Sequence, residues 1–256
     1  MFGRGPSWRP ALADLLAAVL HLIFPATCHV CRRPLDRRRH SALCGRCWDG
    51  LERMPREGCV RCGWPLPGPD GARGVEAPLC QRCRETRDHF GRARAVLRYR
   101  EDGIARAAIL LCKHGRCRPL LQHLGRLLAE EAPRHLPLAE YDAVIPVPLH
   151  WRRRLARGFN QAEVLARAVG RAHGLRVRPW VLRRVRPTPP QQGGREARRR
   201  NVRQAFAVRG RRGIVGRRLL LVDDVFTTGA TANACAEVLL AAGAASVDVL
   251  ALARVE

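Results

Sequence analysis

The chain has 256 residues, 46% of them hydrophobic, which is enough apolar material for one ordinary domain and a smaller module. Its 47 lysines and arginines outnumber 22 acidic residues. The net charge of +25 predicts a polyanionic partner: nucleic acid, a metabolite that carries pyrophosphate, or an acidic membrane surface. An apolar stretch at 11–24 covers about 14 residues and contains Asp14 and His21, so it is too short to cross a bilayer. We therefore expect no integral membrane segment.

Residues 1–24 are predicted to form a short amphipathic helix that packs on the module after it. Peripheral contact with the inner face of a membrane is the alternative. Eleven cysteines would indicate disulfides in a small secreted chain. Eight of the eleven, however, fall into four CxxC pairs, and no export signal precedes them. The sequence therefore predicts a reducing, cytoplasmic location.

Residues 25–90 are predicted to form a double zinc ribbon. Twelve residues separate the first two CxxC pairs and seventeen separate the last two, which is zinc-ribbon spacing. Four thiolates close a tetrahedral site, so we expect one or two structural Zn²⁺ ions and no redox chemistry. The short gap between the second and third pairs favours sequential pairing, while interleaved pairing stays open. The candidate ligands are Cys28, Cys31, Cys44, Cys47, Cys59, Cys62, Cys80 and Cys83.

Residues 91–256 are predicted to form a second domain, which begins with a strand at Ala93–Tyr99 and a helix at Ile104–Lys113. Another buried strand is predicted at Tyr141–Val147, followed by a basic loop that ends at Gly158–Gln161, before a helix. Because arginine forks suit pyrophosphate, this loop is predicted to form an anion site at the edge of the sheet. A solvated basic loop is the alternative. The candidate residues are Arg152, Arg153 and Arg157.

Lys113 is the only lysine among the 47 basic residues. Retention of one lysine indicates a place that needs a compact charge, which the planar guanidinium of arginine does not supply. We expect Lys113 to bind a diphosphate or a base. Chance survival of a single lysine is the alternative.

The segment 183–203 carries eight arginines and one acidic residue, and its prolines and glycines prevent regular structure through its first half. Such a segment is typical of a lid that closes over an anionic substrate and excludes water. A disordered arm that binds polyanions is the alternative. The residues expected to act in the lid are Thr188, Gln191, Arg199, Arg200 and Asn201.

A buried strand at Leu219–Val222 is followed by two carboxylates, a turn rich in hydroxyls, and a helix that runs to Ala242. Unpaired amides at a helix start bind phosphate, and neighbouring carboxylates accept hydrogen bonds from ribose hydroxyls and favour a divalent cation. Ligands of open parallel sheets bind beyond the carboxyl ends of the strands. The pattern therefore predicts a phosphosugar site. Its residues are Asp223, Asp224, Val225, Phe226, Thr227, Thr228, Gly229, Ala230 and Thr231.

This run resembles the signature with which type I phosphoribosyltransferases bind phosphoribosyl pyrophosphate (PRPP). The resemblance implies a parallel α/β sheet flanked by helices, with PRPP as ligand and Mg²⁺ as cofactor. It also implies that Asp223 and Asp224 hold the ribose, while Lys113 stabilises the departing pyrophosphate. These three residues are the candidate catalytic groups.

Four motifs in one order resemble the ComF family of phosphoribosyltransferase-like proteins: the paired ribbons, YDAVIPVPLH, RPTPPQ with RRRNVRQAF, and DDVFTTGAT. The family is associated with DNA uptake during natural transformation. The resemblance implies PRPP as a partner and DNA-uptake proteins as candidates, while the zinc ribbons and the basic excess make single-stranded DNA another candidate. A second copy of the chain is a further candidate partner, and the sequence does not report the oligomeric state. Two functions follow. One is transfer of phosphoribose to an unknown acceptor; the other is a non-catalytic adaptor that handles single-stranded DNA and senses PRPP.

Overall fold

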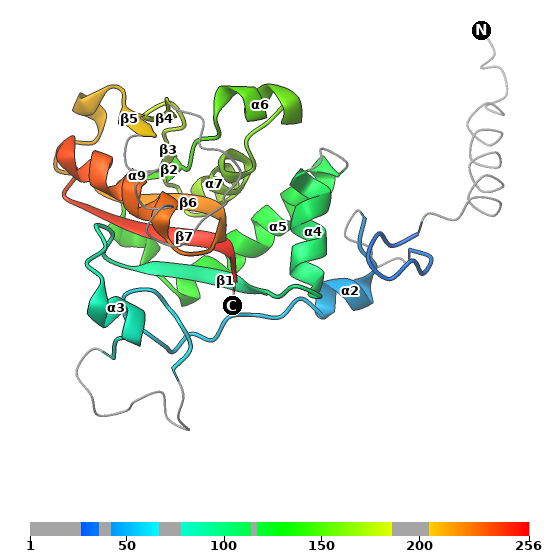
Figure 1. Cartoon of the computed structure of the whole chain (residues 1–256). Coiled ribbons are helices and arrows are strands. Elements are labelled where there is room, and N and C mark those ends of the chain that lie inside the picture. Colours follow the sequence, from blue (N-terminus) through cyan, green and yellow to red (C-terminus); the bar gives the residue numbers. More distant parts are fainter. Residues whose placement is uncertain (1–26, 36–41, 67–77, 114–116, 186–204, 256) are drawn as a thin grey trace, which may run out of the picture. The chain divides into compact units, whose positions relative to one another are not determined.

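The computed structural model describes residues 27–35, 42–66, 78–113, 117–185 and 205–255 (Figure 1). The chain divides into two compact units, Met1–Gly50 and Leu51–Glu256. The second CxxC-rich ribbon, expected to belong to a separate module that ends near residue 90, lies in the same unit as the sheet. The predicted helix at 1–24 and the predicted lid residues lie outside the described residues.

In the first unit, the described residues 27–35 and 42–50 form a small ribbon with an isolated β-bridge. Thr27 and Pro34 form an isolated antiparallel bridge, and the amide of Cys28 donates to the carbonyl of Arg33 at 2.7 Å. A short helix, α2 (Gly45–Asp49), follows Cys44 and carries Cys47. The turn therefore presents Cys28 and Cys31, while Cys44 lies at the N-cap of α2 and Cys47 lies within it.

Five parallel strands form the main sheet of the second unit, in the order β1-β7-β6-β2-β3. Their bounds are β1 Ala93–Tyr99, β2 Ala143–Pro146, β3 Arg176–Val177, β6 Arg218–Phe226 and β7 Ser246–Val255. The central strands β6 and β7 are nearly continuously apolar, because a parallel sheet is covered on both faces. This architecture confirms the predicted parallel α/β class.

Helices cover the two faces of this sheet (Figure 1). Leu219 and Leu221 share one apolar core with Cys235 and Leu239 of α9. Since side chains alternate along a strand, Leu220 points to the other face, where α5 and α7 contact the strands. The helix bounds are α3 Gln81–Glu85, α4 Ile104–Lys113, α5 Arg118–Glu131, α6 Trp151–Arg157, α7 Gln161–Ala172 and α9 Ala230–Ala241. None of the helices in the described ranges is long and apolar enough to cross a membrane.

A separate two-stranded antiparallel sheet pairs β4 (Leu182–Arg184) with β5 (Phe206–Val208). Single turns of 3-10 helix lie at Ala132–Arg134, Leu138–Glu140 and Arg211–Gly213. The β4 and β5 strands flank the segment predicted to be a lid.

Two local predictions differ from the structure. The strand expected to stop at Val222 continues to Phe226, because its pairing with β7 extends through Asp223 opposite Ala251. The basic loop is a helix, α6, since arginine, leucine and alanine all favour helix. The amide of Gly158, at φ 74, donates to the carbonyl of Arg154 at 2.8 Å and ends this helix.

Candidate functional site

A cavity of about 450 Å³ opens at the carboxyl ends of the strands in the second unit. Tyr99 ends β1, Val255 ends β7, Asp223 lies near the end of β6, and Val147 follows β2, so four neighbouring strands deliver residues to one edge. This is the edge at which open parallel sheets bind ligands. The lining residues are Tyr99, Lys113, Val147, Pro148, Leu149, Arg157, Asn160, Gln161, Ala162, Arg184, Asp223, Asp224, Val225, Thr227, Thr231 and Val255.

The two carboxylates predicted from the sequence lie in the wall of this cavity, together with the single lysine. The Nζ of Lys113 is 3.4 Å from an Oδ of Asp224. The Oδ1 of Asp223 accepts from the amide of Asp224, and the Oδ1 of Asp224 accepts from the amide of Val225, both at 2.8 Å. Burial and the adjacent charge of Asp224 raise the pKa of Asp223 well above its usual range. The site therefore holds a carboxylate that is costly to ionise until a cation or a hydroxyl donor approaches it.

The hydroxyl-rich turn joins this acid pair to the N-terminus of α9. Gly229 has φ 76, a left-handed conformation that glycine adopts readily, and it lies at the cap of the helix. Thr227 and Thr231 line the cavity, so the first turn of α9 faces it. The free amides and positive dipole end of a helix start favour a phosphate.

A second helix start, that of α7, borders the same cavity. Asn160 caps α7: its Oδ1 accepts from the amide of Ala162 at 3.2 Å, and its Nδ2 donates to the carbonyl of Val147 at 3.0 Å. Arg157 donates to the Oε1 of Gln161 at 3.2 Å. The Nε2 of Gln161 is buried and has no hydrogen-bond partner among the described residues. A buried donor without a partner is unfavourable, and an acceptor on a ligand would satisfy it. This end of the cavity therefore suits a second anionic group.

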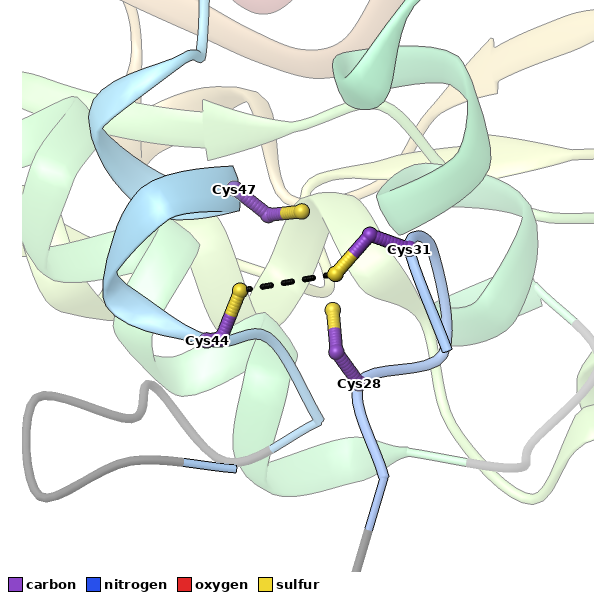
Figure 2. Close-up of side chains that lie close together, drawn as sticks. All are labelled: Cys28, Cys31, Cys44 and Cys47. Atoms are coloured by element: carbon purple, nitrogen blue, oxygen red, sulfur yellow. Dashed lines mark hydrogen bonds between the residues drawn. The ribbon is translucent and has the colours of Figure 1, made fainter. Parts of the chain in front are cut away.

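The eight CxxC cysteines form two clusters, Cys28–Cys47 and Cys59–Cys83, and the sulfur atoms within each lie within 4.8 Å of one another. Figure 2 shows the four thiols of the first cluster converging from the turn and from α2. A sulfur pair is 3.7 Å apart in the first cluster and 3.6 Å apart in the second. A tetrahedral zinc site with Zn–S bonds of about 2.3 Å has sulfur edges of about 3.8 Å. Both clusters therefore fit structural zinc, and sequential pairing is confirmed.

Backbone amides prepare one thiol of each cluster for a metal. Burial raises the pKa of the Cys28 and Cys59 thiols, but hydrogen bonds from nearby backbone groups outweigh it. They lower the pKa of Cys28 to about 6 and that of Cys59 to about 7. A thiolate is the form that binds zinc. The local backbone therefore favours the ligand state before the ion arrives.

The structure brings most of the predicted site residues together. Asp223, Asp224, Lys113 and Arg157 line the cavity, with Val225, Thr227 and Thr231. Thr228, Gly229 and Ala230 form the turn beside it, whereas Phe226 packs beneath the turn in the core. Arg152 and Arg153 lie on α6.

Residues of the cavity wall that the sequence did not single out include Tyr99 and Arg184. The guanidinium of Arg184 lies 5.4 Å from the ring of Phe206, its partner across the β4–β5 pair. The position of Arg184 therefore depends on the pairing of β4 with β5, two strands that are far apart in the sequence. The basic composition of segment 183–203 indicated an anion-binding region, but it did not distinguish Arg184 from the other arginines.

Comparisons with known proteins identify the zinc ribbons and relatives that match nearly the whole chain. A family model described as "Double zinc ribbon domain" matches residues 19–84. DNA utilization protein YhgH of Escherichia coli O6:H1 is 33% identical over 237 residues, which cover 91% of this chain and 99% of that protein. Competence protein F of Haemophilus influenzae is 35% identical over 136 residues, which cover 52% of this chain and 59% of the relative.

Among solved structures, the chain is similar to the glutamine PRPP amidotransferase of B. subtilis. The TM-score is 0.36 at 23% identity, and the match covers 54% of this chain and 26% of that one. A likeness this low carries no argument. The assignment of family rests instead on the relatives that match along nearly the whole chain.

Proposed function

The chain belongs to the ComF family, which includes DNA utilization protein YhgH and competence protein F, and from this premise we propose that its cavity binds PRPP with Mg²⁺. The relatives' names concern DNA use and competence, and we extend a role in DNA uptake to this chain. PRPP carries a phosphate, a ribose with two neighbouring hydroxyls, and a diphosphate. Each of these groups has a matching partner in the cavity wall.

The observation that carries the proposal is the pair of helix starts on one cavity with two carboxylates in the same wall. The start of α9, with Thr227 and Thr231, would hold the 5′-phosphate. The start of α7, with Arg157 and the free Nε2 of Gln161, would hold the diphosphate. A cavity of about 450 Å³ has the volume of an ordinary small-molecule site.

Asp223 and Asp224 fit both the ribose hydroxyls and a magnesium ion, which binds one or two carboxylates plus substrate phosphates. When bound, Mg²⁺ would neutralise charge that develops on the departing pyrophosphate. Lys113 adds a compact cation beside the same carboxylates. Thus the chain's own groups would orient the sugar and receive the negative charge as the bond from the anomeric carbon to pyrophosphate breaks.

Phosphoribosyl transfer is tested by pyrophosphate release from PRPP in the presence of Mg²⁺ and a panel of nucleobase and amine acceptors. We expect release in the native chain and its loss when Asp223→Asn is combined with Asp224→Asn. Glu130→Gln, which alters an exposed carboxylate on α5, is the matched control. Turnover that survives the double substitution would exclude this site as the catalytic centre.

A second candidate function, binding of single-stranded DNA, is favoured by exposed aromatic residues on a basic surface. The side chain of Trp180 is 62% exposed, and the guanidinium of Arg154 lies over its ring at 4.9 Å. Trp151, at the start of α6, is 57% exposed. Aromatic rings that stack bases beside cations that meet phosphates are typical of sites that bind single strands.

This function predicts salt-dependent binding of a single-stranded oligonucleotide, measured by fluorescence anisotropy. Trp180→Ala should weaken binding by about 1–3 kcal/mol while PRPP binding is unchanged. Val215→Ala, a substitution of another exposed apolar side chain, serves as the matched control. No binding at low salt would end the nucleic-acid proposal and leave the PRPP proposal standing.

A further inference from the structure

The second zinc ribbon is hydrogen-bonded to the sheet by two arginines, the half-buried Arg94 and the buried Arg254. Arg94, on β1, donates to the carbonyls of Val60 at 2.9 Å and Arg61 at 3.4 Å. The amide of Ala93 donates to the carbonyl of Arg61 at 2.6 Å. The backbone between Cys59 and Cys62 is therefore hydrogen-bonded to the first strand of the sheet.

Arg254 makes the most direct connection to a zinc ligand. It lies near the end of β7 and is 4% exposed. Its Nη1 donates to the carbonyl of Cys62, and its Nη2 donates to the Sγ of Cys62 at 3.6 Å. The guanidinium lies 5.0 Å from the centres of two rings, Trp64 of the ribbon and Phe226 of β6. One cation therefore joins a metal ligand to the strand that leads into the phosphate turn.

Phe226 lies directly beneath that turn. A Cβ placed on Gly229 would be 2.9 Å from the Cζ of Phe226 and 3.0 Å from the Nη2 of Arg82. Arg82 belongs to α3, between Cys80 and Cys83. The turn at residues 227–231 is thus packed on one side by an aromatic ring that Arg254 fixes, and by a ribbon arginine.

The chain after the last cysteine makes a further contact with the helix that follows the turn. The amide of His89 donates to the Oδ1 of Asn233, one turn into α9. The ring of Phe90 meets the ring of Phe226 edge to face, with the ring centres 6.0 Å apart. These contacts and those of Arg254 approach the turn from different elements.

We propose that the second zinc ribbon positions the phosphate turn, with Arg254 as the positioning residue that connects the metal-bound Cys62 to Phe226. A Zn²⁺ ion with four thiolates carries net negative charge, which offsets the buried charge of Arg254. Without the ion, Cys62 would no longer be held to the other three cysteines of the cluster, so Arg254 and Phe226 would lose a fixed partner. The identity of the bound phosphate rests on the proposed function, whereas the order of the turn does not.

The test is hydrogen–deuterium exchange of the full chain without ligand, read at the amides of residues 226–233. Arg254→Met keeps a long apolar side chain between the two rings but removes the charge. Cys80→Ser removes one ligand of the second cluster. Both should speed exchange in this segment about tenfold, which corresponds to local opening and not to global unfolding. Arg254→Lys, which keeps the charge, should restore part of the protection.

Cys31→Ser is the matched control, because it removes a ligand from the first cluster, which belongs to the other compact unit. It should leave exchange at residues 226–233 unchanged. Protection equal to that of the native chain in Cys80→Ser with its second zinc lost would overturn the proposal. So would acceleration spread equally over α5 and α7. Failure of the native chain to bind PRPP would count against the proposed function alone, since this readout needs no ligand.

Discussion

The buried carboxylate of Asp223 lowers the stability of the ligand-free protein when it is ionised. Its carboxylate is part-buried next to Asp224, and its pKa is raised by desolvation first and by that neighbouring charge second. Lys113 compensates only in part, from the other carboxylate. A ligand that brings hydroxyl donors or a divalent cation would relieve this cost. The free site is therefore destabilised in the manner of many binding sites.

Asp223→Asn should therefore stabilise the ligand-free chain. An acid whose folded pKa is raised costs stability as pH rises from its ordinary value through the folded value. The advantage of the variant should thus be near zero at about pH 4 and grow as the pH rises above that value. It should reach about 1 kcal/mol, or about 2–4 °C in Tm, in thermal melts.

Asp142→Asn is the control, and its expected effect on stability has the opposite sign. The amide of Arg218 and the guanidinium of Arg217 hydrogen-bond the Asp142 carboxylate and lower its pKa, so its contribution is lost as pH falls. This variant should melt below the native chain at neutral pH. If Asp223→Asn also melts lower across the pH range, the interpretation of the acid pair is wrong.

At the level of elements, the β6–turn–α9 unit brings the acid pair and the proposed phosphate site to one edge of the sheet. Gly229 is needed there for two reasons, its left-handed φ of 76 and the atoms that crowd its Cβ position. Gly174 shares only the first, since its φ is 67 and nothing lies within 4 Å of a Cβ placed on it. Comparison of the same substitution at Gly229 and at Gly174 therefore separates the effect of backbone strain from the effect of displacing the turn.

Gly229→Ala and Gly174→Ala should each lose about 1–2 kcal/mol of stability from the left-handed backbone. Only Gly229→Ala should also weaken PRPP binding, because its methyl group displaces Phe226 or the turn. Urea unfolding gives the stability of each variant, and a PRPP titration gives its affinity. Equal affinity in the two variants would mean that the turn does not hold the ligand.

The elements also differ in how well they could be predicted from the sequence. The grouping of the cysteines and the position of Asp223–Thr231 at the end of a strand were predictable, because short contiguous patterns in the sequence encode both. α6 was taken for a loop, since its arginines indicated a site more strongly than their helix propensity indicated a helix. Arg184 and Arg254 were missed, because their positions depend on pairing between segments far apart in the chain. Such contacts leave no local pattern.

On the scale of the whole molecule, the two cysteine clusters belong to different compact units. A separate ion in each cluster predicts two zinc ions per chain by elemental analysis. Cys31→Ser and Cys80→Ser should each lose one ion and keep the other. Loss of both ions from either single variant would indicate shared ligands and contradict the pairing seen in the structure.

The net charge of the whole chain does not identify its ligand. Its excess of +25 is compatible with several polyanions. The cavity wall narrows this choice, since it combines two helix starts with two carboxylates. Carboxylates would repel a bare polyphosphate but suit a sugar between two phosphates, with a metal ion.

The most direct test is a calorimetric titration of the full chain with PRPP, with and without Mg²⁺, beside ribose 5-phosphate. One site per chain is expected, with affinity for PRPP that falls at least about tenfold, or about 1.4 kcal/mol, when Mg²⁺ is removed. Ribose 5-phosphate should bind more weakly, because it leaves Arg157 and Gln161 without an anion. Absence of PRPP binding at millimolar concentration with Mg²⁺ present would contradict the assignment of this cavity.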